Sequence, residues 1–444
     1  MAHAPAAALP KIAATSADLE GMYRFFRNPE VRPEALVAVH AQATAERCRQ
    51  IQSTGTAPVI VVHDTTDFEF EHLEAEDFGF LNTGAAGFRG HFALAVNDTE
   101  VRQPLGVLSL QTIFRKQKRR RKKGATGTET SRWGNRESER WGKGIKEVRE
   151  RIGSDAAIVH VMDREADSFE LLDELVRQND RFVVRLRHDR RAKLSPDDAR
   201  WSTLRALVSR STACLKREVP LSPRRKSTAP REARRRPARK SRMATLHYAT
   251  TQLTIPRPRY LTRSSTDLSL NVIRVYEVDA PPDEPAVEWL LFTNETVESA
   301  DDVARVVDTY RCRWVIEEYF KALKTGCAYE SRYAGSAHAL LNILAVSLPI
   351  AAHLIWLRSR SRTNPDAPAT DVLTDRQIEV IRRTFRLPWF PEQPTARDVL
   401  LAIAENGGHM RSNGEPGWLV LQRGFKTLLE YERGWAAAAE GLNL

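Results

Sequence analysis

The chain has 444 residues, enough for two to four domains, and its 42% apolar and 28% charged residues exclude a wholly disordered or collagen-like protein. The formal net charge is +11. Residues 115–123 and 216–242 hold eight and ten net positive charges, so the rest of the chain is acidic. This distribution indicates a protein that binds a polyanion, first of all nucleic acid, with solvated basic loops as the alternative.

The cysteines indicate a reducing compartment. None lies in a C-x-x-C pair and no histidine pair has metal spacing, so a zinc finger is not expected; the four are Cys48, Cys214, Cys312 and Cys327. Pro5 and Pro10 interrupt the first apolar stretch, and no basic leader precedes it, so secretion is not expected. We therefore predict a cytoplasmic protein.

In chain order, the first half predicts helices and then an alternation of strands and helices. Residues 16–50 predict two helices that are separated at Asn28-Pro29, with Ser16 as a cap. Strands are predicted at 59–62, 90–96 and 105–111, then a helix, a strand, a helix and a strand at 137–151, 156–162, 168–177 and 182–186. This order predicts an α/β fold in which helices flank a mixed sheet.

The second half predicts a β-rich region followed by helices. Residues 187–285 lose the helical periodicity, and a strand at 289–293 resumes the α/β pattern. Ser299-x-x-Asp302 predicts a helix start, and we expect that helix to continue to Thr325, before Gly326. Further predictions are a buried core helix rather than a membrane span at 337–357, a linker at 361–370, and short helices at 371–444 with Trp389, Trp418 and Trp435 available for a small core or an oligomer contact.

Two aspartates follow apolar, strand-like runs. Asp64 comes after residues 59–62 with only His63 between, and Asp163 directly follows residues 158–162. Strand ends in α/β sheets open onto the functional crevice, so carboxylates at two strand ends can share a divalent cation. The alternative is that each aspartate caps a turn or the following helix.

A set of polar residues shares one face of the helix predicted after Ser299. At 100° per residue, Tyr310, Arg313, Glu317 and Lys324 fall within an arc of about 60°. Val303, Val306, Val307 and Trp314 lie on or near the same arc, so this face is expected to pack inward. Buried charges need partners, such as a metal ion for the carboxylate and phosphates for the other groups. An internal salt bridge between Arg313 and Glu317 is the alternative.

Two strand-end aspartates and a helix glutamate form an acidic triad suited to two-metal phosphoryl transfer. One cation prepares a water or 3′-hydroxyl nucleophile and the other stabilises the leaving oxygen. Oxygen ligands of this kind favour Mg²⁺, with Mn²⁺ as a substitute. The basic segments would then bind the DNA backbone in a strongly salt-dependent way.

Three motifs resemble the signature of the cut-and-paste DDE transposases of the insertion sequence 4 family. They are Asp64-Thr65-Thr66, Asp163-Arg164-Glu165-Ala166-Asp167 and Tyr310-x2-Arg313-x3-Glu317-x6-Lys324, the last being the Y-R-E-K motif. The resemblance extends from residues 23–28 to the C-terminal helices. It implies a ribonuclease-H-like core with a β insertion, in which Asp64, Asp163 and Glu317 hold the metal ions.

The same resemblance implies a DNA-binding site. Tyr310, Arg313 and Lys324 would hold the phosphates of transposon ends, and Arg185 would assist them. Trp289 would stack on a flipped base while a DNA hairpin forms, with simple core packing as the alternative. Residues 137–141 and 236–240 are weaker matches, and four acids stay outside the triad although one of them can substitute for a ligand: Asp67, Glu165, Asp167 and Glu318.

With this resemblance the chain divides into five parts. They are a shortened N-terminal helical DNA-binding region (1–50), the ribonuclease-H-like core in two pieces (51–186 and 286–360), a β-rich insertion (187–285) and a helical dimerisation region (361–444). Relatives carry a longer N-terminal DNA-binding region, whereas only 22 residues precede Tyr23 here.

The leading hypothesis is a transposase that cleaves double-stranded DNA at transposon ends and joins the 3′ ends to target DNA as a Mg²⁺-dependent homodimer, without a membrane partner. An N-terminally shortened inhibitor that dimerises with a complete transposase is the alternative. A general ribonuclease-H-like nuclease is the third hypothesis.

Overall fold

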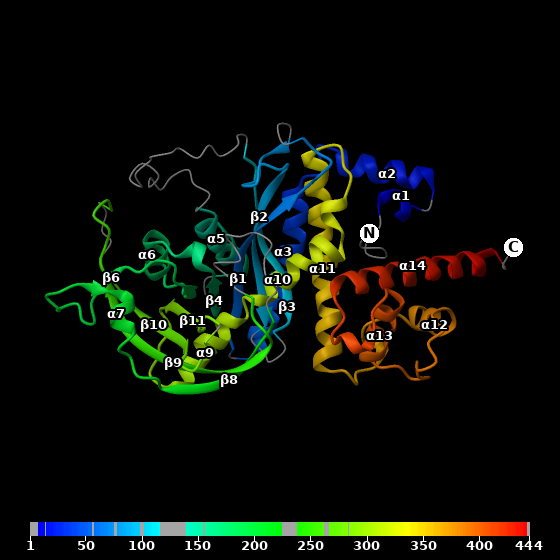
Figure 1. Cartoon of the computed structure of the whole chain (residues 1–444). Helices are drawn as coiled ribbons and strands as arrows, with labels where there is room; N and C mark the ends of the chain where they lie inside the picture. The colour runs from blue at the N-terminus through cyan, green and yellow to red at the C-terminus, as the bar shows by residue number, and fades with distance from the viewer. Residues whose placement is uncertain are drawn as a thin grey trace. The chain divides into compact units, whose positions relative to one another are not determined.

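The computed structural model describes residues 8–13, 15–55, 57–74, 78–97, 102–115, 139–153, 156–223, 238–261, 266–282 and 284–441 (Figure 1). The chain divides into two units. The first unit contains Met1–Val59, Asp64–Ala157 and Trp314–Leu444, and the second contains Ile60–His63 and Ile158–Arg313. Each unit is described by itself.

The first unit begins with helices. The two that the sequence predicts are α2 (Ser16–Arg27) and α3 (Pro33–Thr54), with the predicted break between them, and the short helix α1 (Leu9–Ile12) precedes them without having been predicted. The predicted cap at Ser16 is wrong by one residue. Thr15 is the N-cap, because its hydroxyl accepts the Asp18 N–H at 3.1 Å while the Asp18 carboxylate accepts the Thr15 N–H in return.

The first unit holds strands in the order β3-β2-β1, with β1 at Val59–Glu69, β2 at Gly87–Asn97 and β3 at Pro104–Ile113. Strands β2 and β3 are antiparallel, as expected for consecutive strands. Helices α3, α5 (Arg140–Ile152) and α11 (Ala337–Thr363) pack on β3. The prediction that Asp64 ends a strand is wrong, because the β-branched and aromatic residues Thr65, Thr66 and Phe68 continue β1 to Glu69.

The second unit holds the rest of a mixed sheet. After the Ile60–His63 part of β1 the order is β4-β5-β11-β10-β9-β8. Strands β4 and β5 are parallel and the later pairs are antiparallel. The bounds are β4 Ile158–Met162, β5 Arg181–Arg185, β8 Leu215–Leu221, β9 Arg242–Ile255, β10 Leu268–Glu277 and β11 Glu288–Thr293.

Helices α6 (Phe169–Arg177) and α9 (Ala300–Arg311) pack against strands of this sheet, so the predicted α/β pattern of this unit is confirmed. Within the predicted β-rich region, β8, β9 and β10 lie side by side beyond β11 and continue its sheet (Figure 1). Four short elements complete this unit: the 3₁₀ turn η2 (Arg164–Ala166), a two-stranded sheet of β6 (Arg191–Ala192) and β7 (Ser202–Thr203), and α7 (Leu204–Val208).

The prediction of one long helix from Ser299 to Thr325 is wrong. The chain forms α9, then α10 (Trp314–Lys321), and then the π-helical turn η3 (Ala322–Gly326). The Cys312 N–H bonds to the Thr309 carbonyl at 3.1 Å, and the Arg313 N–H bonds to the Tyr310 carbonyl at 3.0 Å, so a tighter turn ends α9. The predicted shared face therefore does not exist as one helical surface, and Trp314, expected to pack inward, is 55% exposed.

Helix α11 is, among the described helices, the one long and apolar enough to cross a membrane by length and composition. Of its most apolar window 67% is buried inside the protein, which is typical of a core helix. It continues to Thr363, so the predicted linker at 361–370 begins too early. Its buried Asn342 donates to the carbonyls of Phe26 and Val31 at 3.1 and 2.8 Å and so holds the turn between α2 and α3.

The turn η4 (Tyr329–Ser331) precedes α11. Short helices follow α11 as predicted, namely η5 (Ala369–Asp371), α12 (Asp375–Thr384), α13 (Ala396–Asn406) and η6 (Arg411–Asn413), but the last helix, α14 (Trp418–Gly441), is long, with 24 residues (orange to red in Figure 1). Trp418 is buried, and its indole N–H donates to Glu318 at 3.0 Å. The Trp389 indole N–H donates to Glu405 at 2.9 Å. The predicted core use is thus confirmed for Trp418, whereas Trp389 is half-buried and an oligomer contact stays a prediction.

Candidate active site

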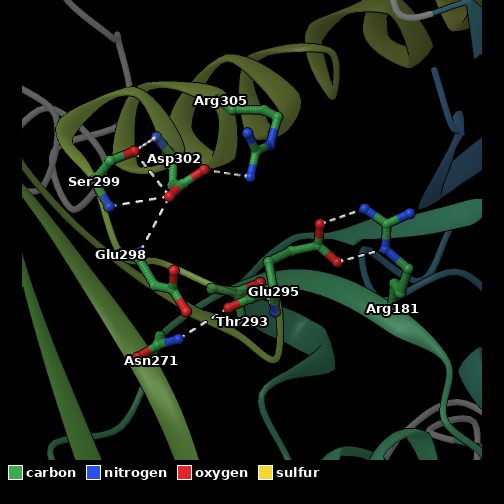
Figure 2. Close-up of polar contacts among 8 residues, drawn as sticks. All are labelled: Arg181, Asn271, Thr293, Glu295, Glu298, Ser299, Asp302 and Arg305. Carbon is green, nitrogen blue, oxygen red and sulfur yellow. Dashed lines mark hydrogen bonds and ion pairs between the residues drawn. The ribbon is translucent and has the colours of Figure 1, made fainter. Parts of the chain in front are cut away.

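Figure 2 shows two groups of polar contacts, one between the start of β5, β10 and the residue pair that follows β11, and one at the start of α9. The Arg181 guanidinium at the start of β5 donates to both carboxylate oxygens of Glu295, at 2.7 and 2.5 Å. Asn271 donates to the Glu295 carbonyl at 2.9 Å. The capping box predicted at Ser299 and Asp302 is present, and Arg305 pairs with Asp302 at 2.7 Å. The first group ties the start of β5 to the segment after β11, and the second caps the start of α9.

Arg185, Trp289 and Tyr310 meet in the second unit, one from each of these elements. Arg185 lies opposite Leu291 in the β5–β11 register, and Trp289 shares a face of β11 with Leu291. The Arg185 guanidinium carbon is 5.6 Å from the centre of the Trp289 ring, and the Trp289 and Tyr310 rings meet edge to face at 6.0 Å. Trp289 is half-buried and packs against both neighbours, so stacking on a base and simple packing both stay predictions.

Positive charge gathers around this aromatic pair. Burial lowers the pKa of Arg185, and the neighbouring cations Arg164 and Arg313 lower it further, whereas a hydrogen bond with Tyr310 opposes the shift. Tyr310 is 3% exposed, and burial raises the pKa of its hydroxyl although Arg185 and Arg313 oppose the rise. The hydroxyl therefore remains a hydrogen-bond donor at neutral pH. Several cations held together with such a donor suit an anionic ligand such as phosphate.

Asp163 belongs to the same neighbourhood, since its charge adds to the rise in the pKa of Tyr310. It directly follows β4 and is the N-cap of η2, where its Oδ1 accepts the Glu165 N–H at 2.8 Å. The capping alternative raised for Asp163 is therefore realised. A carboxylate has two oxygens and several lone pairs, so a capping bond is compatible with a second role. We call Asp163, Arg164, Arg185, Trp289, Tyr310 and Arg313 the Arg185 cluster.

Asp64 lies inside β1, not at its end. Its Oδ1 accepts the N–H of Thr65 at 2.7 Å. The Thr65 hydroxyl accepts from the Arg140 guanidinium at 2.9 Å and is also 2.9 Å from His91 Nδ1. Burial lowers the pKa of His91 well below its ordinary value, and Arg140 and Arg89 add to this effect, so His91 is neutral and Thr65 can donate to it. Arg140, which lies in one of the weaker sequence matches, thus supports the segment that carries Asp64.

The other sequence-predicted residues of the first unit are Glu317 and Lys324. Glu317 is partly buried in α10, a helix that is anchored by the hydrogen bond from the Tyr319 hydroxyl to the Leu348 carbonyl at 2.8 Å. Lys324 lies in η3, where its ammonium donates to the Asp67 carbonyl and pairs with Glu330 at 3.2 Å. One residue of the motif thus forms a salt bridge, Lys324 with Glu330, and the salt bridge between Arg313 and Glu317 stays a prediction.

Metal binding by the predicted triad stays a prediction. Among the residues that the structure describes, no group of three or more His, Cys, Asp and Glu side chains is arranged to hold a metal ion. Asp64 and Glu317 belong to the first unit and Asp163 to the second. The donor set itself, three carboxylates, fits a hard divalent cation such as Mg²⁺.

Three of the acids that the sequence left outside the triad have the following structural partners, and the fourth, Glu165, is exposed. Asp67 pairs with Arg89 at 3.1 Å, and Glu318 pairs with Arg358 and Lys321 at 2.5 and 2.7 Å. Asp167 is buried and accepts the N–H groups of Arg187 and His188 and the Arg190 guanidinium. Sequence reasoning did not find the role of Asp167, because its partners follow 20 or more residues later along the chain.

Most of the two basic segments lies outside the described residues. Arg115 is the described part of residues 115–123 and donates to Asn82 at 2.5 Å. In residues 216–242 the described parts are 216–223 and 238–242, where Arg217 pairs with Asp308 at 2.7 Å and Arg242 pairs with Glu277 and Glu284. These two arginines therefore have internal partners, and the predicted DNA grip of the segments stays a prediction.

A mixed sheet flanked by helices, with a carboxylate among arginine and aromatic side chains after a central strand, fits a ribonuclease-H-like enzyme domain. Residues 137–348 match the family model described as the transposase DDE domain. This match includes Asp163 and Glu317, whereas Asp64 precedes it. The match supports a DDE transposase, a class of nucleases whose substrate is DNA and which typically use divalent metal ions.

Proposed function

We propose that the protein is a cut-and-paste transposase related to the insertion sequence 4 family. It cleaves DNA at transposon ends, through a hairpin intermediate, and joins the 3′ ends to target DNA. The observation that supports this proposal most is the Arg185 cluster, where Arg185, Trp289 and Tyr310 are in contact and the charge of Asp163 acts on Tyr310, within the segment that matches the DDE domain. A nuclease without end specificity has no evident need for a base-stacking indole at such a place.

In this proposal Asp64, Asp163 and Glu317 hold Mg²⁺, or Mn²⁺ in its place. Bound cations would activate a water or 3′-hydroxyl nucleophile and stabilise the leaving oxygen. The carboxylates would supply the negative charge and the oxygen ligands that keep such cations in place. The bond from the Thr65 N–H to Asp64 and the bond from the Glu165 N–H to Asp163 each orient one of these carboxylates beforehand.

The remaining predicted residues would bind DNA. The protonated Tyr310 hydroxyl donates to a phosphate oxygen, and Arg185 and Arg313 supply positive charge beside it. Trp289, half-buried and held between Arg185 and Tyr310, offers one face to a flipped base. We further propose that the enzyme acts as a homodimer on its DNA in the bacterial cytoplasm, where the reduced state of its four free cysteines would be kept.

The test is cleavage of a duplex that carries the inverted repeats flanking the gene, with Mg²⁺ and the full chain. Asp163→Ala and Glu317→Ala are expected to lower the cleavage rate by about 10³-fold or more, as removal of a central catalytic group does. Glu165→Gln is the matched control, since this exposed acid lies beside Asp163, and it should retain cleavage. Unchanged cleavage by either alanine variant would contradict the triad, and equal cleavage of random duplex would favour the general nuclease.

A further inference from the structure

The ammonium group of Lys324 is held by three partners within the first unit. It donates to the Asp67 carbonyl of β1, pairs with Glu330 Oε1 at 3.2 Å, and lies 5.4 Å from the centre of the Phe68 ring. Glu330 Oε1 also accepts the Glu69 N–H of the same strand at 3.0 Å. The lysine and the glutamate are thus both tied to β1, and each is fixed relative to the other.

Two ion pairs lie at this lysine. Glu330 balances Lys324, and the carboxylate of Asp67 is balanced by Arg89 at 3.1 Å. The Lys324 and Glu330 side chains are 28% and 29% exposed, so the pair remains reachable from solvent. An ammonium group has three N–H donors, and the Asp67 carbonyl and Glu330 occupy two of them. Among the described residues no acceptor is recorded for the third donor, which can therefore point at an incoming oxygen atom.

We infer that Glu330 is a specificity-determining residue that cancels the charge of Lys324, so that this lysine meets a DNA phosphate as an oriented hydrogen-bond donor rather than as a free cation. The inference rests on the proposed function, in which Lys324 binds the DNA backbone. A free lysine near DNA strengthens binding to every sequence, because it displaces counterions from any phosphate. A neutral Lys–Glu pair keeps the positioning contact and removes that non-specific attraction.

Glu330→Gln separates charge from geometry. The amide oxygen of glutamine can still accept the Glu69 N–H, so the fold is expected to remain, while the negative charge is lost. The full-length variant is titrated with random-sequence duplex over a salt series. We expect the slope of log K against log salt to become steeper by about 0.9, the value for one further phosphate neutralised. At low salt the variant should bind this duplex on the order of fivefold more tightly.

Two further variants test whether the steeper salt slope comes from Lys324. In the double variant Glu330→Gln with Lys324→Met, the slope should return to that of the wild type, because the released charge is removed again. Glu430→Gln is the control. It also removes the carboxylate partner of a lysine, because Glu430 pairs with Lys426 at 3.8 Å on α14, and it should leave the salt slope unchanged. Circular dichroism and thermal unfolding verify that each variant is folded.

The results of these experiments can overturn the inference without overturning the proposed function. A folded Glu330→Gln variant with an unchanged slope overturns the inference, and so does a steep slope that persists in the double variant. Both results leave the proposed function standing, since it is measured by Mg²⁺-dependent cleavage of transposon ends. Absence of any binding of the wild-type chain to duplex DNA would overturn the proposed function and this inference together.

Discussion

The guanidinium of Arg185 lies over the indole ring of Trp289, with 5.6 Å between the guanidinium carbon and the ring centre. The pair joins β5 to β11, and the Tyr310 ring closes it from α9 at 6.0 Å from Trp289. Cation–π and edge-to-face contacts of this kind each stabilise by about 0.5–1.5 kcal/mol, so the three side chains are arranged before any ligand binds. This prearrangement gives the first prediction.

Trp289→Ala is expected to slow hairpin formation more than the first strand cleavage. Loss of stacking on a flipped base costs about 1–3 kcal/mol, which corresponds to a fall of roughly 5- to 150-fold in the affected step. Trp289→Phe retains an aromatic face and should recover part of the rate. Denaturing gels that separate nicked, hairpin and resolved ends measure both steps. An equal loss in both steps would mean that Trp289 serves only as a packing residue.

Tyr310→Phe is expected to weaken binding of transposon-end DNA while the fold remains stable. The change removes one hydroxyl that bonds with Arg185 and that the proposed function assigns to a phosphate, and a hydrogen bond to a charged group contributes about 1.5–3 kcal/mol. In a double-mutant cycle with Arg185→Met, the two losses should not be additive. Fluorescence anisotropy of end DNA gives the affinities. Additive losses would contradict a shared role of the two side chains.

Substitution by asparagine should affect stability at Asp167 and cleavage at Asp163, although both residues belong to one motif. Asp167 is buried with two backbone N–H donors and Arg190, so Asp167→Asn is expected to destabilise the protein by about 3–5 kcal/mol. Asp163 is only partly buried, so Asp163→Asn should retain most of the stability and lose cleavage. Urea denaturation and the cleavage assay separate the two effects. A fully stable Asp167→Asn variant would refute the structural assignment.

We expect the protein to lose stability in acid because of Asp302 at the start of α9. The Ser299 cap, the backbone N–H groups of Ser299 and Glu298, and Arg305 hold the pKa of Asp302 at about 2, below its ordinary value of 3.8. The Asp302 contribution is therefore complete above pH 3.8 and is lost as the pH falls through about 2. Asp302→Asn should remove this part of the pH dependence. At neutral pH, Ser299→Ala should cost about 1 kcal/mol, measured by urea denaturation. An unchanged acid profile in Asp302→Asn would contradict the prediction.

His40 predicts a second pH effect at higher pH. Burial, assisted by Arg47, lowers its pKa to about 4, and its Nε2 accepts the Val107 N–H at 3.1 Å. Above pH 6.5 both folded and unfolded chains hold a neutral imidazole. As the pH falls from 6.5 to 4 only the unfolded chain takes up the proton, so stability decreases by up to about 3 kcal/mol. His40→Gln keeps an acceptor without titrating and should flatten the unfolding free energy over this range; an unaltered profile would exclude His40 as the source.

Local patterns predicted much of this protein because their causes are local. The capping box at Ser299 and Asp302 forms between residues three positions apart, and the alternation of strands with helices reflects side-chain periodicity within each segment. The same holds for the break at Asn28-Pro29 and for the buried, apolar helix that follows Ser336. The candidate residues Asp163, Arg185, Trp289 and Tyr310 were also found by motif, and the structure gathers them in one cluster.

Tertiary structure decided what depends on residues far apart in the chain. It ended α9 at Arg311 and so divided the predicted Y-R-E-K face, and it continued β1 through Asp64. It gave the Asp167 carboxylate hydrogen-bond donors in a loop about 20 residues later in the chain. It also brought Lys324 into contact with Glu330 and with the Asp67 carbonyl of a distant strand. Periodicity carries no information on such partners, because a buried charge is satisfied by whichever group the packing of the chain brings within hydrogen-bond distance.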